Sequence, residues 1–117
     1  MKYVLLKGQT SKIQSTVYTD NGLSSANLTG ASIQYMFKKN PSDLDSVALL
    51  TKNIGSGVTI ISASDGTVEC LLTAADTNTM SYPSIFFEIL VKLSNGNYIR
   101  SGIEEIVFTK TLIQTLN

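Results

Sequence analysis

The sequence predicts an all-β protein built as a sandwich of two antiparallel sheets, with about seven to nine strands. Three observations support this prediction. Apolar and polar residues alternate along most of the chain, turn-forming residues interrupt the alternation at short intervals, and no long segment has the period of a helix. The 117 residues suffice for one domain, so we place a single domain at 1–117.

Alternation with a period of two marks most of the expected strands. In the strongest, from Ile85 to Leu93, every second residue is apolar and forms one face, while Glu88 and Lys92 mark the other. One face of each strand is therefore expected to lie in the core. The same reasoning predicts further strands at 3–6, 12–18, 32–38, 58–60, 68–72 and 106–109, and a short one near 47–52.

Turn signals separate these strands. The segments 64–66 and 95–96 contain Asp-Gly and Asn-Gly, which tolerate positive φ and predict tight hairpins. The segment 20–22 predicts another turn, and Pro41 predicts a loop around it because it restricts the preceding residue.

A single short helical turn is expected near 73–78. Thr73 and Asp76 have the spacing of a capping box, in which each side chain accepts a hydrogen bond from the other's backbone N–H. The rest of the chain shows no other helical candidate.

The charges balance, which narrows the choice of partners. Lysine plus arginine total 9 and aspartate plus glutamate total 9, so the net charge is 0. Binding to nucleic acid or to an anionic membrane needs a basic excess, so we expect neither as a partner. There is no histidine, the commonest general base and metal ligand, and a single cysteine excludes an internal disulfide or a cysteine-based zinc site.

No group of residues has the pattern of a catalytic or metal site. Cys70 alternates with Val68 and Leu72, which predicts a buried thiol rather than a reactive one. Asp43 and Asp45 offer two oxygen ligands but lack the glycine turn and further carboxylates of a calcium loop. We therefore predict no catalytic, cofactor-binding or metal-binding residues, no cofactor and no enzymatic activity.

A carbohydrate-binding or host-adhesion role is the alternative function. Tyr18, Tyr82 and Tyr98 could serve as stacking platforms for sugars, although a glycan is not the favoured partner. Hydrolysis of sugars is not expected, because the neighbouring carboxylates Glu104 and Glu105 point to opposite faces of a strand.

The N-terminal apolar run, Tyr3 to Leu6, is too short for the apolar region of a signal peptide. No stretch of the sequence has the length of a membrane span. We expect no signal peptide and synthesis in the cytoplasm of the producing cell.

Several short motifs follow one another in a distinctive order. They are Gly8-Gln9-Thr10, Asp20-Asn21-Gly22 at a strand end, Leu28-Thr29-Gly30-Ala31, Leu72-Thr73-Ala74-Ala75-Asp76-Thr77 and Asn95-Gly96 after the long strand. This order resembles that of a small immunoglobulin-like β-sandwich found in tailed bacteriophage virion proteins, such as the N-terminal domain of phage baseplate upper proteins. The resemblance covers Gly8 to about Thr109.

The resemblance implies an immunoglobulin-like fold and a non-enzymatic virion structural protein that is made in the bacterial host. The protein would belong to the tail or baseplate, or would decorate the head or act as an adaptor. Its partners would be other virion proteins and, as a homo-oligomer, further copies of itself.

The apolar terminal segments are the candidate assembly contacts, because uncovered apolar surface usually marks an interface. The candidate residues are Tyr3 and Leu5 in the first strand, and Leu112, Ile113 and Leu116 beyond the last one.

Overall fold

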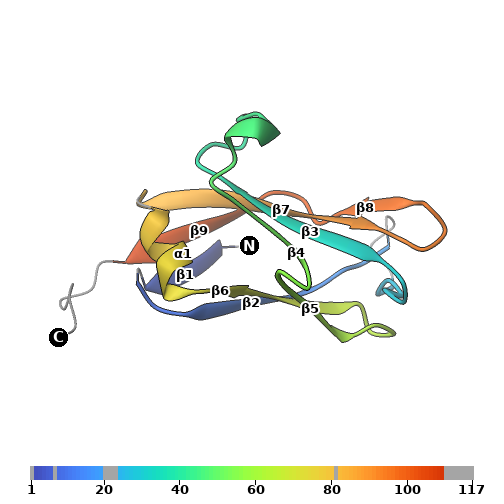
Figure 1. The fold of residues 1–117 in the computed structure, drawn as a ribbon. Helices are drawn as coiled ribbons and strands as arrows, with labels where there is room; N and C mark the ends of the chain where they lie inside the picture. The colour runs from blue at the N-terminus through green and yellow to red at the C-terminus, as the bar shows by residue number, and fades with distance from the viewer. Residues whose placement is uncertain (1, 7, 20–23, 81, 110–117) are drawn as a thin grey trace.

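The computed structural model describes residues 2–6, 8–19, 24–80 and 82–109, and its fold is all-β, as the sequence predicts (Figure 1). These residues form nine strands, the upper end of the predicted range. The strands are β1 (Lys2–Leu6), β2 (Ser11–Thr16), β3 (Ser32–Lys38), β4 (Leu50–Ile54), β5 (Gly57–Ser62), β6 (Thr67–Leu72), β7 (Ser84–Lys92), β8 (Tyr98–Arg100) and β9 (Glu104–Thr109).

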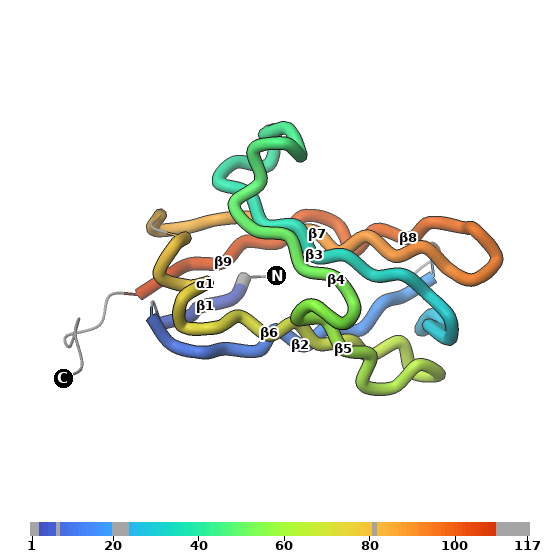
Figure 2. The backbone as a smooth tube through the Cα atoms, in the orientation of Figure 1, coloured from blue at the N-terminus to red at the C-terminus, as the bar shows by residue number. Residues whose placement is uncertain are grey.

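The strands pack in two layers, which Figures 1 and 2 show one above the other. One layer has the order β1-β9-β7-β3-β4, with β8 also paired to β7, and the other has the order β5-β6-β2. In an immunoglobulin-like sandwich, β2, β6 and β5 take the positions of strands B, E and D, and β3, β4, β7 and β9 those of C, C′, F and G. Hydrogen bonds between β4 and β5 join the two layers into one continuous sheet.

The prediction of wholly antiparallel sheets is wrong at two places. β1 runs parallel to β9 along its whole length, and β4 and β5 are parallel at Asn53 and Ile54. Neither pair is a hairpin. β1 and β9 come from opposite ends of the described chain, and the short link between β4 and β5 steps from one layer to the other, so no hairpin turn imposes an antiparallel direction.

The core lies between the inner faces of the layers. Every second residue of β7 from Ile85 to Val91 is buried, as the alternation predicts. Phe87 is surrounded by aromatic rings, with centroids 5.5 Å away in Phe37, 5.9 Å away in Tyr35 and 5.6 Å away in Tyr3. Because such pairs add to the free energy of burial, this cluster holds β1, β3 and β7 together.

The predicted helical turn is the helix α1 (Ala74–Thr79). Its capping box is complete: Thr73 Oγ1 accepts a hydrogen bond from the N–H of Asp76 at 3.1 Å, and Asp76 Oδ2 accepts one from the N–H of Thr73 at 2.9 Å. Asp76 Oδ2 also lies 2.8 Å from Lys52 Nζ, so the helix is tied to β4.

The hairpin turns at 64–66 and 95–96 connect β5 to β6 and β7 to β8, as predicted. The short strand expected near 47–52 lies at 50–54 instead, because the 3-10 helix η1 (Asp45–Val47) precedes it. The predicted turn at 20–22 lies outside the described residues. Neither helix of the described chain is long and apolar enough to cross a membrane.

Candidate interaction site

The sandwich has two seams along which its layers meet, and the two differ. At the seam that we call the closed seam, β4 and β5 pair with each other. At the other, the open seam, β1 ends one layer and β2 ends the other, and no described strand pairs with the outer edge of either. Such edges present unpaired backbone N–H and C=O groups, which can pair with a strand of another chain.

A cleft of about 790 Å³ opens along the open seam. Two continuous segments form its walls, residues 14–19 in and after β2, and residues 98–101 in and after β8. Tyr3, Ile89 and Glu104 complete the lining. Consecutive side chains of a strand point to opposite faces, so a wall of consecutive residues is a strand edge rather than a sheet face.

The wall formed by β2 has backbone groups that face the cleft. The N–H of Val17 donates a hydrogen bond to the carbonyl of Gly66 at 2.8 Å, in register with the pairing of β2 and β6. In an antiparallel ladder such bonds recur at every second residue, so the N–H and C=O groups of Gln14 and Thr16 turn away from β6.

The wall formed by β8 is arranged in the same way. The N–H of Ser101 donates to the carbonyl of Ile89 at 3.0 Å, which by the same alternation turns the backbone groups of Tyr98 and Arg100 away from β7. The side chains of these two residues lie on the outer face of their layer. Arg100 forms an ion pair with Glu88 at 2.9 Å there, so its contribution to the cleft wall comes mainly from the backbone.

Two buried hydroxyl groups belong to this region, that of Ser15 in the lining of the cleft and that of Tyr35 in the core behind it. Ser15 lines the cleft, and neither Ser15 Oγ nor the fully buried Tyr35 hydroxyl has a hydrogen-bond partner among the described residues. Burial raises the pKa of Tyr35 well above its ordinary value, and the neighbouring hydroxyl of Ser15 opposes this rise, so the phenol lies beside one lining residue of the cleft. Buried polar groups without partners are costly, so this part of the cleft suits a polar group from a ligand.

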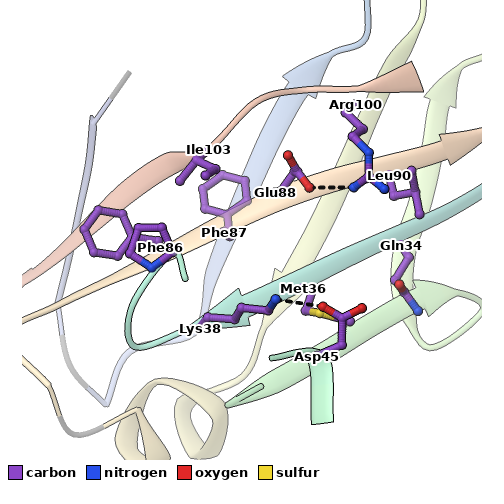
Figure 3. Close-up of a pocket in the computed structure, with 11 residues that line it drawn as sticks. Gln34, Met36, Lys38, Asp45, Phe86, Phe87, Glu88, Leu90, Arg100 and Ile103 are labelled. Atoms are coloured by element: carbon purple, nitrogen blue, oxygen red, sulfur yellow. Dashed lines mark hydrogen bonds and ion pairs between the residues drawn. The ribbon is translucent and has the colours of Figure 1, made fainter. Parts of the chain in front are cut away.

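A second, smaller hollow of about 120 Å³ lies on the outer face of β3 and β7, beneath the loop that precedes β4 (Figure 3). Met36, Phe86, Leu90 and Ile103 supply its apolar lining. Two ion pairs flank it, Arg100 with Glu88 at 2.9 Å and Lys38 with Asp45 at 2.7 Å (Figure 3).

The pair of Lys38 and Asp45 fixes the loop above this hollow. Lys38 Nζ donates hydrogen bonds to Asp45 Oδ1 at 2.7 Å and to the carbonyl of Asp43 at 2.8 Å. The hydrogen bond from Lys38 lowers the pKa of the exposed Asp45 carboxyl. Of the two carboxylates considered as calcium ligands, that of Asp45 therefore pairs with Lys38, and that of Asp43 accepts a hydrogen bond from the N–H of Asn40 at 3.1 Å.

The predicted assembly contacts are placed as follows. Tyr3 and Leu5 are half-buried and pack against the core, so the exposed apolar side chains of β1 are the alternate ones, Val4 at 62% and Leu6 at 44% exposure. Alternation in a strand explains the difference, since one face of β1 is needed for the core. The other predicted contacts, Leu112, Ile113 and Leu116, lie outside the described residues.

The remaining candidates from the sequence are Cys70, possible metal ligands and three tyrosines. Cys70 is buried as predicted, and burial raises its pKa to about 12, so the thiol is not an available nucleophile. The described residues contain no group of three side chains that could hold a metal ion. Of the three tyrosines considered as stacking platforms, Tyr18 and Tyr98 both line the cleft, from its opposite walls, whereas Tyr82 lies beneath Lys39 and is not part of the lining.

Sequence reasoning missed the cleft. The available signal was Ser15, a polar residue in the inward-facing row between Ile13 and Val17. A hydroxyl in such a row indicates a position where the core is incomplete or polar.

Comparison with known proteins gives no match: no family model matches the sequence, and no curated protein is significantly similar to it.

Proposed function

We propose that this protein is a non-enzymatic structural component of a tailed bacteriophage particle that acts through protein–protein assembly. The motif order from Gly8 to about Thr109 supports the phage setting through the family resemblance. The free edge of β1, with its exposed apolar side chains, carries the assembly role.

Edge strands of proteins that stay separate are usually blunted by charge, proline or a covering segment. After Lys2, the exposed side chains of β1 are instead Val4 and Leu6, which lie on the outer face of the strand beside its unpaired edge. The apolar side chains on an unpaired edge favour contact with another chain, because contact removes both apolar surface and open backbone groups from water.

A particle test addresses the phage setting. Mass spectrometry of purified phage particles is expected to detect this protein at a constant ratio to the major structural proteins. Its absence from particles that assemble while it is being produced would contradict the proposal.

A variant test addresses the assembly role. Val4→Lys places a charge at the free edge of β1 and is expected to reduce incorporation into particles or complexes at least tenfold. Ile61→Lys is the matched control, because Ile61 is similarly exposed but lies on β5, away from this edge. Equal incorporation of both variants would argue against β1 as the contact.

A further inference from the structure

We infer that the open-seam cleft receives residues 110–117 of a second copy of this chain as an added strand along the free edge of β2. The inference rests on the proposed function and deepens it, because it names the receiving site and the segment that fills it.

The cleft has the form of a strand site. Both walls are strand edges, and Gln14 and Thr16 on one side face Tyr98 and Arg100 on the other with their backbone groups turned outward. Such groups are satisfied by an extended chain, which forms hydrogen bonds with both the N–H and the C=O of every second residue of an edge. β2 has the longer edge of the two, with six residues against three in β8.

The fold already places one strand in this seam. β1 covers the edge of β9, and the same edge of the layer continues along β8 without a cover among the described residues. The cleft therefore lies along the edge formed by β9 and β8, and β1 covers only the β9 part of that edge. A second extended segment could cover the β8 part in the same way, which argues for an extended chain rather than a compact ligand.

The segment 110–117 has the composition of a strand. It contains Thr, Leu and Ile, has no glycine, proline or acidic residue, and carries one charge, on Lys110. In extended form it presents Leu112, Gln114 and Leu116 on one side and the intervening residues on the other.

This side matches the interior of the cleft. Ile89, Ile99 and Val17 are buried residues of the lining, and they suit the two leucine side chains. Gln114 lies between the leucines in the sequence, and its side-chain amide has donors and an acceptor that suit Ser15 Oγ, which lines the cleft.

The geometry favours an exchange between copies. β9 ends at Thr109, opposite Leu6, whereas the cleft begins near Tyr3, about 10 Å back along β1. Because β9 runs parallel to β1, its direction at Thr109 is away from the cleft, and a segment entering its own cleft would have to reverse. Reciprocal exchange between two copies closes a two-fold dimer, whereas one-way donation from copy to copy joins different surfaces head to tail and builds a ring or a filament.

The test measures self-association of the full chain by light scattering, with a free peptide of residues 109–117 as competitor. We expect association into a dimer or a larger assembly, which the peptide reverses. Gln14→Pro is expected to abolish association, because it removes an N–H that faces the cleft but leaves the bonds to β6 intact. Its thermal unfolding is measured alongside to confirm that the variant folds.

Ser15→Ala supplies a second variant that changes one lining side chain of the cleft. Removing the unpartnered hydroxyl is expected to leave the free energy of unfolding equal or higher, while association weakens about 3- to 10-fold because the contact with Gln114 is lost. A purely structural role of Ser15 would not separate these two readouts. Ser32→Ala is the matched control, because Ser32 is exposed on β3 and does not line the cleft, and it is expected to change neither.

The outcomes separate this inference from the proposed function. If the full chain associates but the peptide and Gln14→Pro have no effect, the cleft is not the site, and the assembly role stands. If the full chain stays a monomer at high concentration and NMR shows no shift of the amides of residues 14–16 on adding the peptide, the inference is overturned. The assembly role then depends on the particle test alone.

Discussion

The two seams of the sandwich differ in how the backbone groups of their edge strands are paired. At the closed seam, β4 leaves its own layer and pairs with β5 of the other, so backbone groups of both are satisfied within the chain. At the open seam, β1 and β2 stay in separate layers with a cleft beside them. The difference teaches that the core does not need both sides sealed by strand pairing, because the inner faces of β3, β6 and β7 alone supply half of its buried apolar residues.

The largest expected effect comes from Phe87, the ring that links the core to the open seam through Tyr3. Phe87→Ala is expected to lower the free energy of unfolding by about 3–5 kcal/mol, because it leaves a cavity among three aromatic rings. Urea unfolding measures the loss. Hydrogen exchange should show amides of β1 losing more protection than those of β5, since Tyr3 loses its neighbour.

Phe86→Ala is the matched control for this variant. Phe86 is half-buried on the outer face of the same strand, so its truncation is expected to cost clearly less. A loss at Phe87 below 1 kcal/mol, or equal losses at both positions, would contradict the placement of the core.

The next effect concerns the hairpin that carries β5 of the closed seam. Gly66 has φ of 71°, and a Cβ there would lie 2.7 Å from the carbonyl oxygen of Val17 and 2.8 Å from that of Ala26. Gly66→Ala is expected to lower the free energy of unfolding by more than about 1 kcal/mol, because both strain and clash oppose the side chain. Gly96 also has a positive φ, but an added Cβ there would meet no atom within 4 Å. Gly96→Ala therefore carries the backbone strain alone, and the difference between the melting temperatures of the two variants measures the cost of the contacts at Gly66. Equal melting temperatures would exclude that close approach.

A smaller effect is expected at the end of the closed seam, where Lys52 of β4 meets Asp76 of α1. Burial alone would raise the pKa of Asp76, but hydrogen bonds from Lys52 and from Thr73 outweigh it, so the pKa is lowered below its ordinary 3.8. The ionised Asp76 carboxylate therefore makes its full contribution to the free energy of unfolding above pH 3.8. This contribution is lost as the pH falls from 3.8 through the lowered pKa.

Asp76→Asn is expected to lower the free energy of unfolding by about 0.5–2 kcal/mol at neutral pH, through loss of the ion pair and the cap. Urea unfolding at pH 7 and at pH 3 measures the effect, and the gap between variant and natural chain should narrow at the lower pH. A gap that stays constant would show that the carboxylate charge is not what stabilises this end.

The smallest expected effect on stability lies at the open seam. Thr16→Lys changes an exposed residue on the free edge of β2, so the free energy of unfolding should change by no more than about 0.5 kcal/mol. Denaturant unfolding checks this, and a loss above 1 kcal/mol would mean that the edge is structurally engaged within a single copy.

Much of the fold was predictable because alternation is a local signal. The inward rows of β3 and β7, the buried Cys70 and the capped turn after Thr73 all follow from neighbours along the chain. The parallel pairing of β1 with β9 was not predictable, since it depends on which distant strand lies beside Lys2–Leu6. The same limit applies to the cleft, whose two walls are some eighty residues apart in the sequence.

The predicted assembly contacts show where local reasoning was incomplete. Tyr3 and Leu5 are apolar and terminal, but the sequence does not tell which face of the first strand the core requires. Val4 and Leu6 are the exposed pair because the ring of Tyr3 packs against Phe87. The orientation of a terminal strand is therefore decided by a contact with a residue far along the chain.

The parallel pairing of β1 and β9 also determines how the molecule bears mechanical load. Tension applied at Lys2 and at Thr109 pulls the two strands along their length in opposite directions, because these residues stand at opposite ends of the pair. All the hydrogen bonds between the strands then resist together in shear, instead of breaking one after another as in the peeling of a hairpin. A particle that transmits force along this chain would thus strain a cooperative block of bonds, and rupture would be governed by the rate of unfolding rather than by the equilibrium free energy.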